Sequence, residues 1–347
     1  RSLASIVDLI ARIEGVELVA IFGPEHGFRG AEQAGDKVGD ARDPRTGVPV
    51  HSLYGATRRP TPEMLEGIDV ILFDIQDVGV RAYTYLSTLV EVLHAAKENG
   101  VEVWVLDRPV PTGADRIEGP ILEAGRESFV GAHMIPLRHG LTAGEFALLV
   151  DREREIGASP RIVRMENYRR DMTWEETGIP WVAPSPNIPT VDIALIYAGM
   201  VLIEGTNLSE GRGTTRPFQL VGAPWIDGAR LAEELRALEL PGVLFREAWF
   251  TPTFSKHDGK ACQGVEIHVT DRRAYRSVRT ALEVIAAVRR FWPEDFRFRE
   301  SGFDRLAGTA KLREALLAGT PPAEIESEWE ASLEAWRKKH EGLLLYR

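Results

Sequence analysis

The sequence predicts an α/β protein: a Rossmann-like parallel sheet with helices on both faces, followed by a smaller α+β domain. The apolar run at residues 70–73 and the largely apolar run at 101–106 indicate buried strands, which are typical of parallel sheets. Segments with helical periodicity separate these runs, as expected for an α/β fold. After about residue 220 the pattern changes, and residues 264–269 alternate between apolar and polar in the manner of an antiparallel strand.

The composition is that of a folded, acidic protein. Its 347 residues are 44% hydrophobic, which is enough for substantial cores, and we expect two domains at residues 1–220 and 221–347. The net charge of −10 and the lack of a basic run argue against a nucleic-acid partner. The single Cys262 excludes an internal disulfide. No apolar run approaches the ~20 residues of a membrane span.

The spacing of apolar residues predicts most elements in order. In the first domain we expect helices over 2–13 and 86–99 and strands over 16–22, 48–53, 70–73, 101–106 and 161–165. Thr142 and Glu145 form the pattern of a capping box, which predicts a helix that ends near residue 154. The apolar segment 191–203 is also expected to be helical. In the second domain we expect strands over 243–250 and 264–269 and helices over 227–238, 273–290, 309–318 and 322–339.

Charged side chains follow the ends of three predicted strands. Glu25 and His26 follow the strand 16–22, Asp74 and Asp77 follow the strand 70–73, and Asp107 follows the strand 101–106. The carboxyl ends of parallel strands share one edge of a sheet, where ligands bind, so we expect these groups to lie in one crevice. No Gly-x-Gly-x-x-Gly motif joins a strand to a helix, which disfavours a dinucleotide. We therefore expect no cofactor.

Two glycine-rich segments carry further candidates. Residues 22–30 hold Glu25, His26 and Arg29 among three glycines and a proline, and the loop continues to about residue 47. Long loops within a compact domain are usually functional. Residues 204–218 combine polar side chains with glycines that let the backbone approach a ligand. A solvated turn and an interdomain loop are the alternative interpretations of these two segments.

Five segments together resemble the NamZ-type exo-β-N-acetylmuramidases, glycoside hydrolase family 171, formerly known only as a domain of unknown function. They are residues 22–30, 74–85, 106–109, 184–189 and 204–218. The resemblance runs almost end to end and implies a Rossmann-like catalytic domain with a smaller C-terminal domain. It also implies release of terminal N-acetylmuramic acid from the non-reducing end of peptidoglycan fragments. In that family the glutamate of the Gly-Pro-Glu-His-Gly motif is the proposed catalytic residue, and it corresponds to Glu25.

The resemblance also bears on location. Relatives usually begin with a further strand, and we expect that strand and any secretion signal to lie before Arg1. An extracytoplasmic location is therefore expected from the family.

Glycoside hydrolysis needs an acid that protonates the leaving oxygen and a group that stabilises or attacks the anomeric carbon. Glu25, flanked by Pro24 and Phe28, is the candidate acid. Its partner is expected among the remaining carboxylates of the motifs, and a 2-acetamido sugar can also use its own carbonyl. Retaining, inverting and substrate-assisted routes all remain open. The candidates for the partner are Asp74, Asp77, Glu204 and Glu210, with Asp74 and Glu204 taken as catalytic.

The lactyl carboxylate of muramic acid calls for a guanidinium, which binds a carboxylate through two parallel hydrogen bonds. Arg212 is favoured because glycines flank it, and the other candidates are Arg29, Arg81 and Arg216. Tyr83 and Tyr85 are candidates to pack on a sugar ring, with core aromatics as the alternative interpretation. The remaining polar residues expected to bind substrate are His26, Gln76, Asp77, Asn187, Asn207 and Glu210.

Two other functional classes are compatible with parts of the sequence. A metal-dependent hydrolase would draw on His26, His51, Asp74, Asp77 and His133, but no His-Glu-x-x-His or comparable spacing is present. We therefore expect no metal. A peptidoglycan-binding module without catalysis would use the arginines and aromatics, but it would not need a protonatable glutamate.

Overall fold

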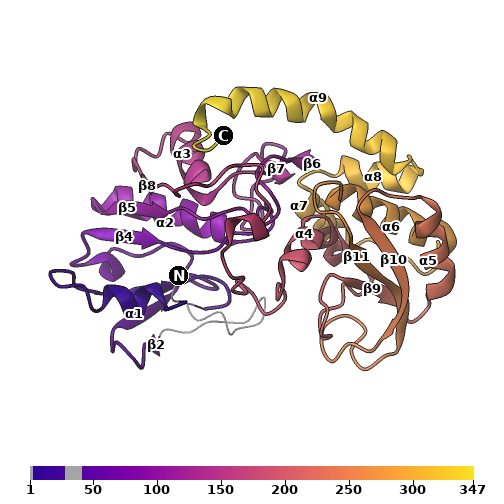
Figure 1. Cartoon of the computed structure of the whole chain (residues 1–347), viewed down its shortest axis with the longest axis horizontal. Helices are drawn as coiled ribbons and strands as arrows, with labels where there is room; N and C mark the ends of the chain where they lie inside the picture. The colour runs from indigo at the N-terminus through magenta and orange to yellow at the C-terminus, as the bar shows by residue number, and fades with distance from the viewer. Residues whose placement is uncertain (1–2, 28–40) are drawn as a thin grey trace.

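The structure is a computed structural model that describes residues 3–27 and 41–347, and it confirms the predicted α/β class (Figure 1). The N-terminal part contains α1 (Ile6–Ile10), β1 (Ile21–Gly23), β2 (Ala41–Arg42), β3 (Pro49–Ser52), β4 (Val70–Phe73), α2 (Tyr85–Asn99), β5 (Glu102–Leu106), β6 (Glu118–Ile121), β7 (Pro136–Arg138), α3 (Ala143–Glu153) and β8 (Arg161–Val163). The C-terminal part contains α4 (Val191–Met200), β9 (Leu220–Ala223), α5 (Gly228–Ala237), β10 (Val243–Phe250), β11 (Cys262–Val269), α6 (Ser277–Phe291), α7 (Glu300–Ala307), α8 (Lys311–Ala318) and α9 (Pro322–His340). No helix of the described residues is long and apolar enough to cross a membrane.

The centre of the N-terminal part is the parallel sheet β4-β5-β8. Helices α2 and α3 pack against β5. Their buried side chains, among them Leu89, Leu93 and Phe146, share one core with Val103 and Val105 of the strand. Helix α3 begins with the predicted capping box, in which Thr142 and Glu145 each bond the other's backbone N–H. Local sequence rules therefore located these central elements well.

The first elements differ from the prediction. Strand β1 covers only Ile21–Gly23 and pairs in parallel with β3, in a sheet separate from β4-β5-β8. Helix α1 has five residues and buries none of them. Leu9, Ile13 and Val16 are all about half exposed. A helix this short depends on tertiary packing for its stability, and the described residues provide little packing here.

The C-terminal part is built on the antiparallel sheet β10-β11-β9, whose predicted pair β10 and β11 is confirmed. Helices α5 and α4 contact this sheet, and α6 packs against both. Ser277 of α6 donates its hydroxyl to the Leu195 carbonyl of α4 at 2.8 Å. A Cβ at Gly199 would meet the Ser277 carbonyl at 1.9 Å, so only glycine allows this approach of the helices. By its contacts α4 lies with the C-terminal part, before the predicted boundary near residue 220.

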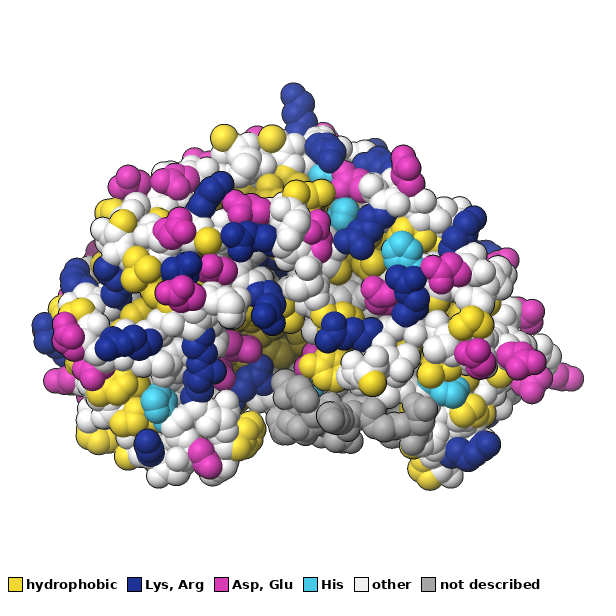
Figure 2. All heavy atoms as spheres, turned by 180° about the vertical axis from the view of Figure 1, so that it is seen from behind, with side chains coloured by type: hydrophobic (Ala, Val, Ile, Leu, Met, Phe, Trp, Pro, Cys, Tyr) yellow, Lys and Arg dark blue, Asp and Glu magenta, His cyan; other side chains and the backbone are white. Residues whose placement is uncertain are grey.

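Helix α9 crosses from the C-terminal part back to the N-terminal part (Figure 1). Its first half packs on α6 and α8. At its other end the Trp336 indole donates to the Met134 carbonyl at 3.3 Å. The Tyr346 hydroxyl, beyond the helix, then donates to Asp107 at 2.7 Å. The two parts are therefore joined twice, once before α4 and once by α9, and the face shown in Figure 2 is hollowed between them.

Candidate active site

Glu25 lies in a tight turn directly after β1. The Gly27 N–H donates to the Pro24 carbonyl at 3.0 Å, and His26 has a φ of 72°, in the left-handed region that few non-glycine residues adopt. His26 is 4% exposed, so the turn is part of the packed structure. The Glu25 carboxylate accepts a 2.6 Å hydrogen bond from the Thr84 hydroxyl at the start of α2. Backbone strain of this kind is often kept at functional sites.

Tyr54, which follows β3, also interacts with the Glu25 carboxylate. Burial, together with the Glu25 charge and a hydrogen bond to Glu25, raises the pKa of Tyr54 to about 12. The phenol therefore keeps its proton at neutral pH and can donate it in a hydrogen bond. The charges of Arg58 and Arg212 lower the pKa of the same phenol and so oppose this shift. Because Arg212 belongs to the C-terminal part, Tyr54 and Glu25 lie where the two parts meet.

The C-terminal part contributes four ionisable groups, here called the charged cluster: Glu204, Glu210, Arg212 and Lys256. Arg212 lies 3.0 Å from Glu204 through Nη2 and 3.4 Å from Glu210 through Nε. The Lys256 ammonium lies 2.8 Å from the second oxygen of Glu210. The cluster thus has two carboxylates and two cations and is formally neutral. Glycine-rich backbone carries three of its members within nine residues, as the sequence pattern suggested.

Burial shifts the proton affinities of the charged cluster. It raises the pKa of Glu204, an effect that the neighbouring Arg212 charge opposes and the Glu210 charge increases. Burial also lowers the pKa of Lys256, while Glu210 opposes that shift. The pKa of Arg212 is raised, since Glu204 and Glu210 together outweigh its burial. Protonation of Glu204 therefore falls closer to neutral pH than protonation of an exposed glutamate.

A row of buried aromatic rings runs from the Glu25 side to the charged cluster. Tyr85 and Tyr83 have ring centroids 4.6 Å apart, Tyr83 and Tyr197 are 6.1 Å apart, and Tyr197 and Phe218 are 4.7 Å apart. Arg212 lies over the Phe218 ring at 5.0 Å. Tyr83 and Tyr85 are 7% and 3% exposed, so their rings are core aromatics rather than an open face for a sugar.

Tyr197 lies among the ionisable groups of both parts. Burial raises its pKa well above the usual value, and the charges of Glu204, Glu25 and Asp77 add to the shift. Arg212 opposes it. One phenol is therefore electrostatically coupled to Glu25 and to Glu204, two of the three carboxylates that the sequence predicts to be catalytic.

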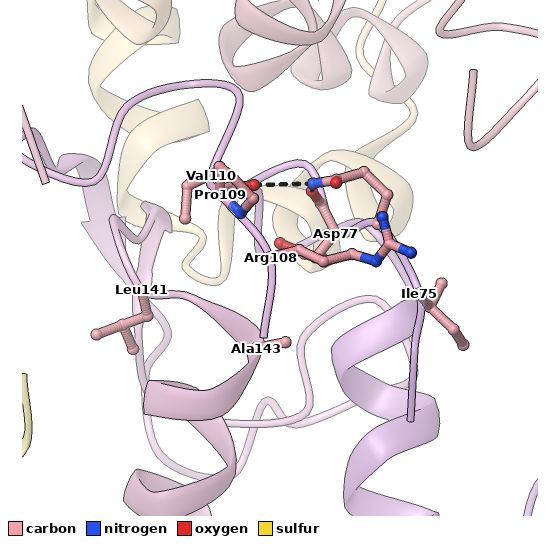
Figure 3. Close-up of a pocket in the computed structure, with 8 residues that line it drawn as sticks. Ile75, Asp77, Arg108, Pro109, Val110, Leu141 and Ala143 are labelled. Atoms are coloured by element: carbon pink, nitrogen blue, oxygen red, sulfur yellow. Dashed lines mark hydrogen bonds between the residues drawn. The ribbon is translucent and has the colours of Figure 1, made fainter. Parts of the chain in front are cut away.

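The carboxyl ends of β4 and β5 also meet, as predicted, in the small crevice of Figure 3. The Arg108 guanidinium binds Asp74 at 2.5 Å. The Gln76 amide donates to the Pro109 carbonyl at 2.9 Å, which is the dashed line in Figure 3. Asp77 is buried and accepts a 2.7 Å hydrogen bond from the Gly79 N–H. The Asp74 carboxylate is therefore neutralised by Arg108 rather than bound by the partners of Glu25, which argues against its predicted catalytic role.

Arg81 has a structural role instead of the predicted substrate-binding role. Its guanidinium is buried and donates to the carbonyls of Pro120 and Ile135, both at 2.8 Å, and to two carbonyls at the C-terminal end of α7. Burial lowers the pKa of Arg81 to about 9. Sequence reasoning could not foresee this, because the four acceptors lie between 39 and 226 residues away.

Two other predicted residues also bind protein groups. Asn207 uses both polar atoms of its side chain, donating to the Asp295 carbonyl at 2.8 Å and accepting from the Arg297 N–H at 2.9 Å. The amide therefore ties its loop to residues 295–297, and one N–H and one lone pair of the side chain remain for a ligand. Arg216 forms ion contacts with the buried Glu266 and is itself half exposed. It therefore has N–H donors that can face a ligand.

The remaining candidates are placed as follows. Asn187 is buried, and its N–H donates to the Ser185 hydroxyl at 3.1 Å. Arg29 lies outside the described residues. Of the histidines considered for a metal, His133 instead bonds Glu153 at 2.9 Å. Within residues 3–27 and 41–347, no group of three or more His, Cys, Asp or Glu is arranged to hold a metal ion.

Four residues near Glu25 or in the charged cluster were not singled out from the sequence: Tyr54, Thr84, Tyr197 and Lys256. Tyr54 follows a predicted strand end, and Thr84 lies within the segment 74–85, so the strand-end rule could have found both. Tyr197 lies in an apolar helix and Lys256 in an irregular loop. Neither has a local signal.

The comparisons with known proteins agree over the whole chain. Residues 1–192 match the N-terminal domain of exo-β-N-acetylmuramidase NamZ, and residues 195–346 match its C-terminal domain. The chain is 51% identical over 346 residues to peptidoglycan β-N-acetylmuramidase NamZ of Bacillus subtilis (strain 168), a match that covers 99% of this chain and 84% of that protein.

Two solved structures from Bacteroides fragilis NCTC 9343, both of DUF1343 family proteins, are also similar. The first has a TM-score of 0.89 at 36% identity and covers 99% of this chain and 90% of its own. The second has a TM-score of 0.76 at 30% identity and covers 96% and 87%. The predicted resemblance is thereby confirmed, and the chain belongs to the NamZ family of exo-β-N-acetylmuramidases.

Proposed function

We propose that this protein is an exo-acting β-N-acetylmuramidase that releases terminal N-acetylmuramic acid from the non-reducing end of peptidoglycan fragments. One observation carries the proposal: Glu25 is bound by Thr84, coupled to Tyr54, and linked through Tyr54 and Tyr197 to the charged cluster. This is a glycosidase-like arrangement of carboxylates from two parts of a chain. Because peptidoglycan lies outside the cell membrane, the proposal implies an extracytoplasmic location.

Glu25 acts as the acid. It transfers its proton to the glycosidic oxygen as the bond from that oxygen to the anomeric carbon breaks, and the leaving sugar departs as an alcohol. A water molecule then adds to the anomeric carbon and returns a proton to Glu25. The hydrogen bonds with Thr84 and Tyr54 orient the carboxyl group for both transfers.

Glu204 is the second carboxylate of the proposal. Of the four candidate partners, Glu204 is the one whose charge raises the pKa of Tyr197 most, and the charge of Glu25 raises the same pKa. Burial raises the pKa of Glu204, and Arg212 at 3.0 Å opposes this rise and so favours the ionised form that stabilises positive charge at the anomeric carbon. In a substrate-assisted route the same carboxylate orients the acetamido group instead.

Arg212 holds the lactyl carboxylate in this proposal. Its Nε and Nη2 contact Glu210 and Glu204, so the substrate carboxylate uses the remaining Nη1. The Phe218 ring beneath the guanidinium fixes its plane. Of the predicted arginines within the described residues, Arg212 is the one whose charge acts on Tyr54 beside Glu25.

The test distinguishes the roles of Glu25 and Glu204 by comparing substrates whose leaving groups do or do not need a proton. Glu25→Gln and Glu204→Gln are assayed on the disaccharide N-acetylmuramic acid–N-acetylglucosamine and on a 4-nitrophenyl muramide, whose leaving group departs without protonation. Glu25→Gln should lose ~10²–10⁴ in kcat on the disaccharide and much less on the nitrophenyl substrate. Glu204→Gln should lose activity on both. Exposed Glu66→Gln is the matched control. If Glu25→Gln stayed within a few-fold of wild type on both substrates, Glu25 would not be the acid.

A further inference from the structure

The C-terminal part has a second concave site, a groove of about 640 Å³ beside the edge strand β10. One wall is the loop 213–216, and the other is the segment 251–254 that follows β10. The two walls are fastened together, since Thr253 donates through its N–H and its hydroxyl to the Gly213 carbonyl, both at 2.9 Å. A Cβ at Gly213 would lie 2.6 Å from the Phe254 carbonyl, so the walls are packed backbone to backbone.

Both walls lead directly into the charged cluster. Residue 213 follows Arg212, which binds Glu204 and Glu210. On the other wall, Phe254 lies two residues before Lys256, whose ammonium binds Glu210. Two segments of chain therefore run from the walls of the groove into the site that we propose for the terminal sugar.

The lining of the groove suits a carbohydrate that carries a carboxylate. Phe254, on the wall 251–254, has a ring that is 40% exposed. Trp249 is also exposed, but the regular register of β10 with β11 points its side chain to the face of the sheet opposite Arg246, where Glu247 holds the indole N–H at 2.9 Å. An exposed aromatic ring is typical of surfaces that pack against a sugar face.

Two arginines also line the groove and give it a positive charge. Arg216 and Arg246 both contact Glu266, which is completely buried, and their own side chains are 50% and 65% exposed. Two guanidinium groups thus share one carboxylate, which leaves a net positive charge and N–H donors that face solvent. A neutral sugar would have no use for this charge, whereas a carboxylate would bind to it.

We infer that this groove binds the continuing glycan strand on the leaving-group side of the substrate, with Phe254 against a sugar ring and Arg246 on the lactyl carboxylate of the next N-acetylmuramic acid. The inference rests on the proposed function, since it assigns a place to the part of the substrate beyond the bond that is cleaved. In a peptide-free strand, lactyl groups are the only carboxylates, and they recur on every second sugar. The positive charge of the groove therefore matches the lactyl carboxylates of the glycan strand, which is the ligand that we assign to the groove.

The experiment compares kcat/KM on the peptide-free disaccharide and on the peptide-free tetrasaccharide of two such units. Wild type should prefer the tetrasaccharide, and Phe254→Ala should lower kcat/KM on it by about five- to tenfold while leaving the disaccharide within twofold. Leu244→Ala is the matched control, because Leu244 is 60% exposed on the same strand but lies outside the groove. Its kcat/KM on both substrates should equal that of wild type.

A second measurement tests the charge. Methyl esterification of the inner lactyl group should lower the wild-type kcat/KM on the tetrasaccharide by about tenfold. Arg246→Gln should remove this sensitivity. If that variant unfolds, the wild-type rates on the free and the methyl-esterified tetrasaccharide still show whether the groove recognises the carboxylate.

The outcomes separate this inference from the proposed function. If wild type fails to hydrolyse the disaccharide, the proposed function is wrong, and binding of the tetrasaccharide to Glu25→Gln by calorimetry still tests the groove. If wild type treats both substrates equally and Phe254→Ala changes neither rate, the groove does not bind the strand. Competition by free stem peptide but not by free glycan would also overturn the inference.

Discussion

The Thr84 hydroxyl donates a 2.6 Å hydrogen bond to the Glu25 carboxylate, which lies 59 residues earlier in the chain. This bond joins the turn after β1 to the start of α2. Thr84 immediately precedes α2, but its side chain does not cap the helix. The hydroxyl is therefore available to Glu25, and the position of the proposed acid depends on it.

Thr84→Val tests this dependence. We expect kcat to fall by about ten- to a hundredfold with little change in KM, because a hydrogen bond to an ionisable group is worth roughly 1.5–3 kcal/mol. Helix α2 should be unaffected, and the melting temperature checks this. Thr88→Val is the control, since that hydroxyl has only a 3.4 Å contact with a backbone carbonyl one turn away. Equal losses in both variants would show that packing, not the bond to Glu25, sets the rate.

Arg212→Ala tests recognition of the lactyl group. A site that holds a carboxylate with a buried arginine discriminates strongly, so glucosaminides should be poorer substrates than muramides by at least ~10². The variant should slow the muramide by a similar factor and leave the weak glucosaminide rate nearly unchanged. If both rates fall by the same factor, Arg212 acts through Glu204 and Glu210, its partners in the charged cluster, and another group holds the lactyl carboxylate.

Exo action is a third expected outcome. Glu25 and the charged cluster come from the two parts of the chain and are coupled through Tyr54, so the site is bounded on more than one side. Digestion of peptide-free glycan strands should release monosaccharide from the first time point. Internal fragments early in the digestion would show an open site instead. Size separation of the products over time distinguishes the two patterns.

The pH dependence of stability should show the contribution of Glu153. Burial alone would raise the pKa of this carboxylate, but hydrogen bonds with Lys339, His340 and His133 outweigh it and lower the pKa to about 2. A lowered pKa contributes stability above the ordinary value near 4.5, and this contribution is lost as the pH falls through about 2. Glu153→Gln should therefore destabilise the protein by about 1–3 kcal/mol at pH 7. The difference from wild type in thermal unfolding should shrink as the pH falls from the ordinary value toward the lowered one.

The control for that experiment is Glu127→Gln, since Glu127 is exposed. Its melting temperature should follow wild type at every pH. A difference between wild type and Glu153→Gln that stayed constant over the whole acidic range would mean that the variant acts through packing rather than through charge.

Local patterns in the sequence were sufficient for the elements that depend on local physics. The capping box of Thr142 and Glu145, the apolar face of α2 and the antiparallel pair of β10 and β11 follow from neighbouring residues. By contrast, α1 has the expected apolar spacing but little to pack against, and α7 has no clear signal. A local sequence pattern shows which element a segment can form, whereas tertiary contacts decide whether that element is stable.

The site divides in the same way. The sequence predicts Glu25 and the loop of Glu204 as site residues because glycine-rich backbone surrounds them. It misjudged Arg81, because the carbonyl groups that this residue binds are remote in sequence and carry no residue-specific signal. Tyr197 was missed for the opposite reason, since a tyrosine in an apolar helix looks like any other core residue. The rule that polar residues follow strand ends places Asp74 and Asp77 at the edge where the carboxyl ends of β4 and β5 meet. It could not predict that Arg108 neutralises Asp74 there.

The double connection between the two parts limits how the site can open. A chain that crosses once leaves its halves free to swing and twist, but here α9 is a second crossing, a stiff rod of 19 residues and about 28 Å. Its ends are fixed on opposite sides, by Arg276 and Arg279 on Glu326 and by His340 on Glu153. Two crossings leave the two parts fewer relative motions than one crossing would, and rotation about the line joining the crossings is the motion that disturbs both of them least. A motion of that kind would change the distance between Glu25 and Arg212, which lie on different parts.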